Sequence, residues 1–239
     1  MKKKPGILTA SLLAAALCLS IAPAPALAES TASESDAPYQ RGTLTAESFE
    51  SEWLNLRYTP ASYMIMSTEE EVDAVMNAGK DLIEDSSGME INDEALTGTV
   101  YEMMAASASG YPNVSLIVEA ATMTNMTSDQ YLGALQDMLD ATQLGYEYNE
   151  EPVDITIAGQ EFRRLDAGIS YNGYDILQSY CVRRQGDKFV AIILSYTPDT
   201  TDQAGETLDS FTALSSVEEE SESEGKDLFH SILDNYTKE

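Results

Sequence analysis

The sequence predicts an α+β domain built around antiparallel strands, and three patterns support this prediction. Four strand-like segments follow one another between residues 153 and 197. Asn172-Gly173 and Gly186-Asp187, which separate the last three segments, are typical β-hairpin turns, so these strands should be antiparallel. The segment after Ser128 instead carries apolar residues at the spacing of a helix that buries one face.

The first elements alternate in type. Phe49 and the segment 53–59 (WLNLRYT) indicate an opening pair of strands, and 63–66 (YMIM) indicates a short third one. A capping box then precedes apolar residues at helical spacing, which predicts a helix over 68–84. Residues 85–97 combine acids with a Ser-Ser-Gly turn and are predicted to form a loop.

The middle and the end of the chain continue this alternation. The segments 98–107 and 113–122 flank Gly110-Tyr111-Pro112 and indicate a hairpin of buried strands. A second helix is predicted from about Ser128, with one apolar stripe made of Tyr131, Leu132, Leu135, Met138, Leu139 and Leu144. A final helix over 201–214 closes the predicted domain, because its apolar residues also recur in helical phase.

This order of elements resembles the PsbP-like family of alpha/beta/alpha sandwich proteins. The stretches FESEWLNLRYTPASYMIMSTEEEV and KFVAIILSYTPDTTDQAGETLDSFTAL bound the resemblance, which covers nearly the whole domain and rests on element order. The family includes photosystem oxygen-evolving subunits, a Ran-binding nuclear transport factor and many exported bacterial proteins. The resemblance implies an antiparallel sheet flanked by helices and a binding or assembly role instead of catalysis. It transfers no functional residue.

Residues 1–28 have the composition of a signal peptide. Three lysines precede an apolar stretch over 7–21, and Ala26-Leu27-Ala28 is a small-x-small cleavage site, so cleavage is expected after Ala28. We therefore expect a secreted or extracytoplasmic protein without membrane insertion after cleavage. Retention of the segment as an anchor is the alternative.

The remaining chain divides by composition. Residues 29–41 are small, polar and acidic, which is typical of a disordered tether. A single domain is predicted over 42–215, followed by an acidic linker over 216–225. Residues 226–239 are predicted to hold a short amphipathic helix, which must dock on the domain or on a partner, because so short a helix is marginal alone.

The chain is strongly acidic, with a formal net charge of -28. Removal of 1–28 would delete three lysines and leave 41 acidic against 10 basic residues, a net charge of about -31. This argues against nucleic acid as a partner, because nucleic-acid binding depends on neutralising phosphates. It favours a solvated surface whose copies repel one another, and hence a monomer. Calcium binding by carboxylates is an alternative, but no calcium-loop pattern occurs, and no metal or cofactor is predicted.

Cys181, in the stretch SYCVRRQGDKF, is the only cysteine after Cys18. The two hairpin turns place it opposite Arg164 on one side and Ile192 on the other, which predicts a buried core residue. Arg164 and Arg183 could alternatively activate the thiol. A cysteine nucleophile normally needs a base, however. The only histidine, His230, lies beyond the acidic linker.

Basic residues gather in the same region as Cys181, within positions 163 to 188. The predicted register places Arg163 and Arg184 on one face of the sheet and Arg164 and Arg183 on the other. One interpretation is pairing with Glu161, Asp166 or helix carboxylates. The other is a ligand-binding site for a small anionic molecule or an acidic segment of a partner protein. The candidate site residues are Arg163, Arg164, Arg183, Arg184 and Lys188.

Two functions therefore remain open at the level of sequence. The first is an exported, non-catalytic binding or interaction module whose ligand or partner is unknown. The alternative is an extracytoplasmic hydrolase that uses two carboxylates, which cannot be singled out among 41 acidic residues. The sequence contains neither a Gly-x-Ser-x-Gly elbow nor a phosphate-binding glycine loop.

Overall fold

The computed structural model describes residues 38–74, 98–121, 123, 125–149, 151–171 and 173–214. Five predicted segments lie outside these residues: the signal segment, residues 29–37 of the tether, the loop 85–97, the acidic linker and the C-terminal helix. Of the helix predicted over 68–84, residues 68–74 are described, and 69–74 are helical.

Within the described residues the strands form two antiparallel sheets. The small sheet has the order β1-β2-β3-β12 and consists of β1 (Thr43–Leu44), β2 (Phe49–Ser51), β3 (Leu56–Tyr58) and β12 (Phe211–Thr212). The large sheet consists of β4 (Met64–Met66), β5 (Thr99–Ser107), β6 (Asn113–Ala120), β7 (Glu147–Tyr148), β8 (Val153–Ile157), β9 (Gln160–Tyr171), β10 (Tyr174–Gln185) and β11 (Lys188–Tyr196). Its order is β4-β5-β6-β11-β10-β9, and both β7 and β8 pair with β9.

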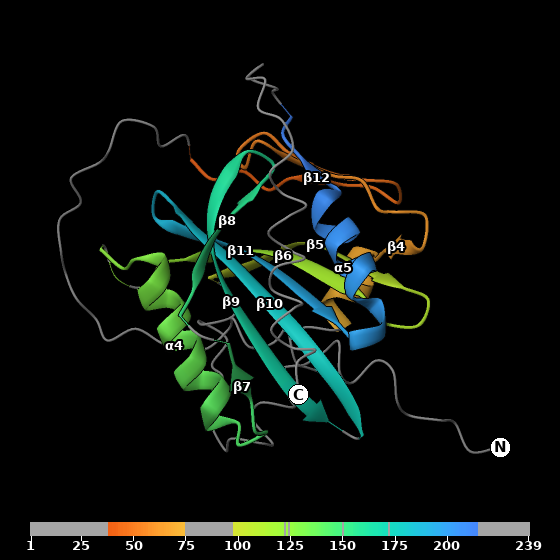
Figure 1. The fold of residues 1–239 in the computed structure, drawn as a ribbon. Coiled ribbons are helices and arrows are strands. Elements are labelled where there is room, and N and C mark those ends of the chain that lie inside the picture. The colour runs from red at the N-terminus through yellow and green to blue at the C-terminus, as the bar shows by residue number, and fades with distance from the viewer. Residues whose placement is uncertain are drawn as a thin grey trace.

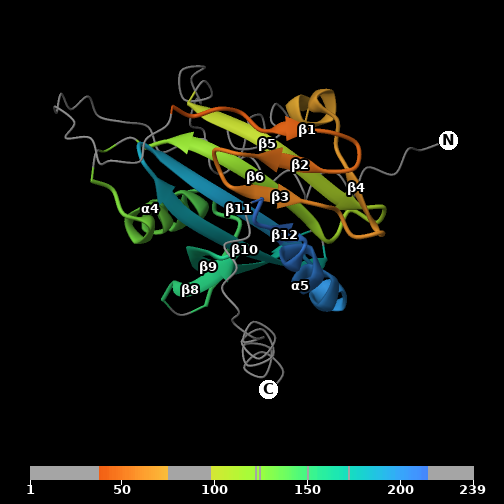
Figure 2. The same cartoon turned by 90° about the horizontal axis from the view of Figure 1, so that it is seen from above.

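The domain has three layers, with the large sheet in the middle (Figure 1). Helix α4 (Ser128–Ala141) covers one face of this sheet, against β9 and β10. The small sheet and helix α5 (Thr201–Asp209) cover the other face. Figure 2, which looks down on the small sheet, shows β1, β2 and β3 in front of β5 and β6. The expected antiparallel sheet flanked by helices is confirmed.

The predicted hairpin register is also confirmed. Cys181 pairs with Arg164 on β9 and with Ile192 on β11, as the two turns require. Gly173 has a φ of +82°. This tight turn needs such a backbone conformation, and glycine adopts it without strain. The residues of the two hairpin turns therefore determine how β9, β10 and β11 pair.

Helix α4 begins at Ser128, where the apolar pattern predicted its start. Thr127 is the N-cap, and its side chain accepts a hydrogen bond from the Gln130 backbone N–H at 3.2 Å, while the Gln130 side chain accepts from the Thr127 N–H at 2.9 Å. This reciprocal pair satisfies two backbone donors that the helix itself cannot. The helix buries the stripe expected from sequence, except that Leu144 lies beyond its end. Packing of this stripe fixes α4 on the sheet.

The final helix is shorter than predicted. It was expected over 201–214, but α5 ends at Asp209, and Phe211–Thr212 form strand β12 beside β3. Phe211 pairs with Tyr58 in this register, with their ring centroids 4.7 Å apart. Phe211 is also in phase with the apolar stripe of the predicted helix. Periodicity alone therefore did not distinguish a longer helix from a helix followed by a strand.

Two hydrophobic clusters, one on each face of the large sheet, form the core. Strand alternation sorts the side chains. On β11, Ala191 and Ile193 face α4, whereas Ile192 and Leu194 face the small sheet. Cys181 belongs to the second cluster and is fully buried. Burial raises the pKa of its thiol to about 12, with Arg164 lowering and Asp166 raising it by smaller amounts.

A buried carboxyl group links α4 to the sheet. The Tyr131 hydroxyl of α4 donates a hydrogen bond of 2.7 Å to Glu119 of β6, which is 7% exposed. Burial raises the pKa of Glu119 to about 7, and the hydrogen bond from Tyr131 acts in the opposite direction. Glu119 therefore takes up a proton in the folded state at a higher pH than in the unfolded chain.

The first prediction concerns the reactivity of Cys181. In a Cys18→Ser background, where Cys181 is the only thiol, we expect iodoacetamide at pH 7 to label the native chain about a thousandfold more slowly than the urea-unfolded chain. The reason is the smaller thiolate fraction that follows from the raised pKa, together with lack of access. Comparable labelling rates in the two states would show that Cys181 is an accessible, activated thiol.

The second prediction concerns Glu119. Its folded pKa lies above the unfolded value of 4.5, so its contribution to stability is fully present below pH 4.5 and is lost as the pH rises through about 7. We expect Glu119→Gln to raise the free energy of unfolding by no more than about 1 kcal/mol at pH 5. At pH 8 it should make the chain up to about 3 kcal/mol more stable than the wild type.

Urea titrations at the two pH values measure this difference. Glu161→Gln, which removes an exposed charge from β9, serves as the control and should show no such pH dependence. A stability difference between Glu119→Gln and wild type that stays constant from pH 5 to pH 8 would contradict the raised pKa.

Candidate functional site

Two of the five basic residues predicted as a ligand site lie on the α4 face of the large sheet. Arg163 bridges two elements, with its guanidinium 2.7 Å from Asp129 of α4 and 2.7 Å from Asp154 of β8. Both hydrogen bonds raise its pKa. Arg184 donates a hydrogen bond of 2.9 Å to the Met126 carbonyl, just before α4. These arginines hold the start of α4 against the sheet.

The next two arginines lie on the opposite face, beneath the small sheet. Arg164 is 2.9 Å from Asp166, which also accepts a hydrogen bond of 2.6 Å from Ser179. Arg183 lies over the ring of Phe162, 5.4 Å from its centroid, and burial lowers the pKa of its guanidinium to about 10. A cation over the face of an aromatic ring is attracted by the ring electrons.

Lys188 lies at the start of β11, 3.3 Å from Asp187. Two of the predicted ion pairs are present: Arg164 pairs with Asp166, and Arg163 pairs with Asp129 of helix α4. The sheet divides the four arginines between its two faces, as the register predicted, and does not bring all five basic residues together. Their binding of an anionic ligand stays a prediction.

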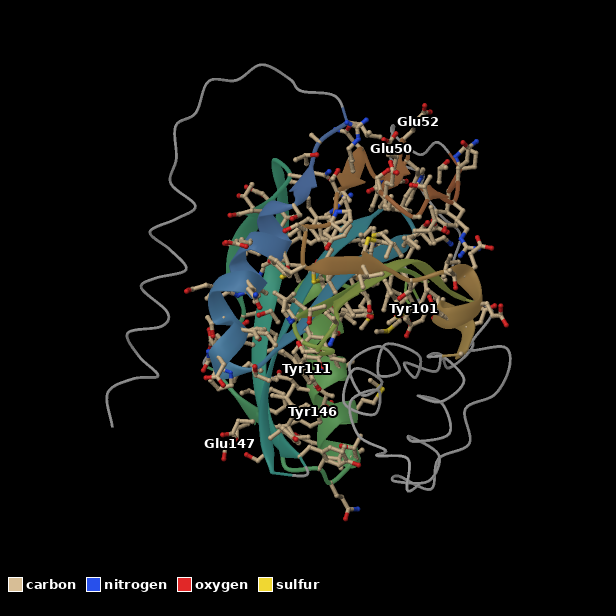
Figure 3. The ribbon with its side chains drawn as sticks, turned by 90° about the vertical axis from the view of Figure 1, so that its right-hand side faces the viewer. Glu50, Glu52, Tyr101, Tyr111, Tyr146 and Glu147 are labelled. Carbon is tan, nitrogen blue, oxygen red and sulfur yellow. The ribbon has the colours of Figure 1, made fainter. Side chains whose placement is uncertain are left out.

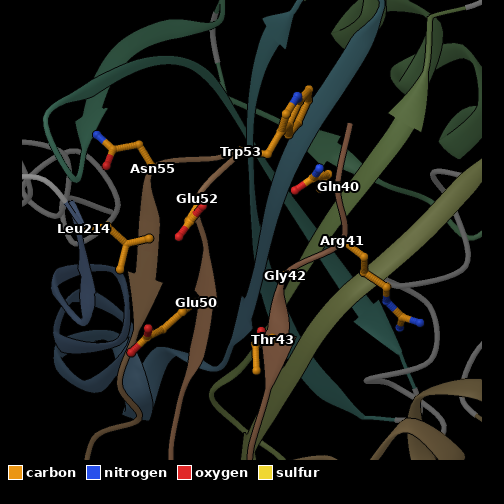
Figure 4. Close-up of a pocket in the computed structure, with 9 residues that line it drawn as sticks. All are labelled: Gln40, Arg41, Gly42, Thr43, Glu50, Glu52, Trp53, Asn55 and Leu214. Atoms are coloured by element: carbon orange, nitrogen blue, oxygen red, sulfur yellow. The ribbon is translucent and has the colours of Figure 1, made fainter. Parts of the chain in front are cut away.

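A polar cleft of about 600 Å³ opens elsewhere, on the outward face of the small sheet (Figure 4). Residues before and in β1, in β2, in the β2–β3 turn and after β12 form it. Its side chains supply two carboxylates, two amides, a hydroxyl, a guanidinium and an indole. The lining residues are Gln40, Arg41, Gly42, Thr43, Glu50, Glu52, Trp53, Asn55 and Leu214.

A row of polar residues across the small sheet forms the floor of the cleft and its surroundings. Thr43 pairs with Glu50, Glu50 with Arg57, and Arg57 with Thr212. Because side chains alternate along a strand, the neighbours of this row point into the core. Arg57 Nε lies 2.9 Å from Glu50 Oε1, and both side chains are partly exposed.

A buried carboxylate of the large sheet holds one wall of the cleft. Glu102, which lies at a register shift in β5, is 1% exposed. It accepts hydrogen bonds from the Tyr39 hydroxyl at 2.5 Å and from the Gly42 N–H at 3.0 Å. Burial, followed by the contact with Glu102, raises the pKa of Tyr39. Residues 38–41, assigned to the tether from sequence, therefore lie on the domain.

Gly42 brings this wall close to β2. A Cβ atom at this position would overlap the ring of Phe49 and lie 2.7 Å from the Glu50 carbonyl oxygen. Only a residue without a side chain allows the chain to approach β2 this closely.

The β2–β3 turn forms the other wall and is held from below. Gln185 donates a hydrogen bond of 2.7 Å to the Trp53 carbonyl, and Gln160 donates to the carbonyls of Leu54 and Asn55 at 3.0 and 3.2 Å. Trp53 also contacts Tyr39 edge to face, with a ring separation of 5.2 Å. The two walls therefore support one another, and both are anchored in the large sheet.

The cleft can bind polar groups, but its lining lacks the usual nucleophile and base. None of the nine lining residues is a serine, cysteine or histidine. Within the part of the chain that the structure describes, no group of three or more His, Cys, Asp or Glu residues is placed to hold a metal ion. Glu50 and Glu52 are the carboxylates of the site, and they lie at the opposite end of the molecule from Tyr146 and Glu147 (Figure 3).

Tyrosines on the α4 face are packing residues instead. Tyr146 is 8% exposed and stacks with Tyr148 at a centroid distance of 6.4 Å, while Tyr111 packs against the same cluster. Burial raises the pKa of Tyr111 to about 12.

Among the described helices, none has the length and apolar composition that a membrane span requires.

Sequence reasoning did not identify the cleft. Its residues come from 40–43, 50–55 and 214, and no motif connects these segments. One signal was available, because Glu102 is an acidic residue inside an apolar strand segment. Such a residue needs a buried partner, and its partners here are the wall residues Tyr39 and Gly42.

No family model and no curated protein matches the chain. Among solved structures, cyanobacterial PsbP (CyanoP) from Synechocystis is 14% identical, with a TM-score of 0.41 over 74% of this chain and 98% of that chain. A Bacteroides thetaiotaomicron protein is 8% identical, with a TM-score of 0.40 over 74% and 52%. LpqN, involved in cell envelope biogenesis of Mycobacterium tuberculosis, is 19% identical, with a TM-score of 0.27 over 42% and 62%. Each of these TM-scores lies below 0.5, and identities this low say nothing of ligand or activity.

The third prediction tests the anchor of the cleft. Glu102→Gln replaces one acceptor oxygen by an N–H₂ group that faces a donor. We therefore expect a loss of about 1–3 kcal/mol in the free energy of unfolding. The amide hydrogen of Gly42 should also exchange faster. The matched control is Glu47→Gln, on the exposed β1–β2 turn. It should change stability by no more than about 0.5 kcal/mol, as is usual for surface substitutions. Equal stability of the two variants would rule out the anchoring role.

Proposed function

We propose that this chain is an exported, monomeric, non-catalytic binding module whose ligand binds in the cleft of the small sheet. The observation that carries this proposal is the support of the cleft walls. Glu102 holds residues 39–42, and Gln160 and Gln185 hold the β2–β3 turn. A preformed site loses little conformational entropy when a ligand binds.

The lining residues support recognition of a small polar ligand or a short segment of a partner. The cleft contains the amides of Gln40 and Asn55 beside its two carboxylates. Amides both donate and accept hydrogen bonds, and carboxylates accept them. Trp53 adds a rigid aromatic surface with a single donor. This combination provides contact area together with directional hydrogen bonds, which are the usual sources of affinity and specificity.

A hydrolase that uses Glu50 and Glu52 is the catalytic alternative. Glycoside hydrolysis needs one carboxyl group kept protonated by an apolar setting, beside a second that stays ionised. Glu52 is exposed, and Glu50 is partly exposed and lies against Arg57. Neither carboxyl group has an apolar setting, and this favours binding over hydrolysis.

The fourth prediction tests the binding site by NMR. When a panel of oligosaccharides, amino acids, polyamines and short peptides is titrated into the ¹⁵N-labelled chain, we expect the shifts caused by a binder to concentrate on the Trp53 indole and the Asn55 and Gln40 amides. Trp53→Ala should weaken that binder by about tenfold or more, because buried aromatic contacts dominate such sites. Gln40→Ala should weaken it as well, without disturbing the Trp53–Tyr39 contact.

Tyr174→Ala is the control, because Tyr174 is an aromatic residue of β10 that is 65% exposed and lies outside the cleft. It should leave affinity unchanged. Saturable shifts that map to another surface would refute the proposed site. Turnover of an ester, peptide or glycoside that is lost in both Glu50→Gln and Glu52→Gln would establish the hydrolase instead.

A further inference from the structure

We infer that the group bound in the cleft is cationic, an ammonium or a guanidinium, as carried by a basic peptide or a free polyamine. This inference rests on the proposed function, because it names the ligand chemistry of the same cleft. It depends on where the charged side chains of the lining point, on the position of Trp53 and on the charge of the whole chain.

The cation that lines the cleft is turned away from it. Arg41 donates a hydrogen bond of 3.0 Å to the Tyr101 carbonyl, and its guanidinium lies 3.9 Å from Glu69. Figure 4 shows this guanidinium directed away from Glu50 and Glu52. Arg41 therefore supplies its backbone and side-chain stem to the wall, and its charge acts elsewhere.

The two carboxylates remain on the cleft side of the small sheet. Glu50 and Glu52 are two positions apart, in the middle of β2 and in the turn that follows it. Arg57 offsets the charge of Glu50 through an ion pair of 2.9 Å. The exposed Glu52 then leaves the cleft with a net negative charge, which a cationic group would neutralise at a short distance.

The indole of Trp53 adds a second interaction that favours a cation. Trp53 directly follows Glu52 and lines the same cleft. Tryptophan is the aromatic side chain that attracts cations most strongly, and a carboxylate beside it adds a directed ion pair. A neutral ligand would use the indole surface but leave Glu52 without a charged partner.

The charge of the whole chain acts in the same direction. The formal net charge is -28. Long-range attraction therefore raises the encounter rate with cations and opposes the approach of anions. The arginines that could have received an anion are engaged elsewhere: Arg163 with two carboxylates and Arg164 with Asp166. A basic ligand is therefore the one that both the cleft and its surroundings favour.

The test compares three probes on the full chain: pentalysine, spermidine and pentaglutamate, each titrated at low and at near-physiological salt by NMR. We expect saturable binding of a cationic probe, with shifts at Trp53 and Asn55, and no saturable binding of pentaglutamate. At the higher salt, Glu52→Gln should weaken the cationic probe by about three- to fivefold. Glu47→Gln removes the same charge from the β1–β2 turn, outside the lining. It should weaken the probe by no more than about 1.5-fold, because salt screens distant exposed charges.

The outcomes separate this inference from the proposed function. Tighter binding of pentalysine identifies a basic peptide as the ligand, and tighter binding of spermidine identifies a free polyamine; both support a cation site. Equal losses in Glu52→Gln and Glu47→Gln would reduce the effect to general surface charge and overturn the inference. Shifts at Trp53 caused only by neutral or anionic compounds would overturn it too, while leaving the cleft as the binding site.

Discussion

The large sheet is apolar on both of its faces, and the rest of the structure follows from the need to cover both. Strand β11 is almost entirely buried, with successive side chains entering different core clusters. Helix α4 covers one face, whereas a second sheet and α5 share the other. A small sheet that buries its inner side must leave its outer side to solvent, and the cleft lies on that outer side.

This arrangement also governs how an acidic chain places its few buried charges. Arg164 pairs with Asp166 inside the layer beneath the small sheet, and Arg183 lies against an aromatic ring where no carboxylate contact is seen among the described residues. Glu102 and Glu119 are each held by a tyrosine hydroxyl from another segment. A buried polar group costs free energy unless it is hydrogen-bonded, so the two glutamates specify which segments must pack on them.

The sequence was most informative where local chemistry decides structure. The turns around Gly173 and Gly186 gave the strand register, and the pattern after Ser128 gave α4 and its buried face. It was least informative where distant segments meet. Phe211 lies in a strand because its ring packs on that of Tyr58, which is far away in sequence. The same limit applies to the cleft, whose walls depend on contacts between residues about 60 to more than 100 positions apart.

The contacts of residues 39–42 with β5 have a further consequence, for association between copies of the chain. Strand β4 pairs only with the last part of β5, from Ala105 to Ser107. Further along this edge, the Ser67 N–H donates a hydrogen bond to the Met104 carbonyl, and the Arg41 side chain donates one to the Tyr101 carbonyl. Backbone groups at an open sheet edge are templates for edge-to-edge aggregation. The segment that builds the cleft therefore also shields part of this edge, and its detachment would expose the Tyr101 carbonyl to pairing with a strand from another molecule.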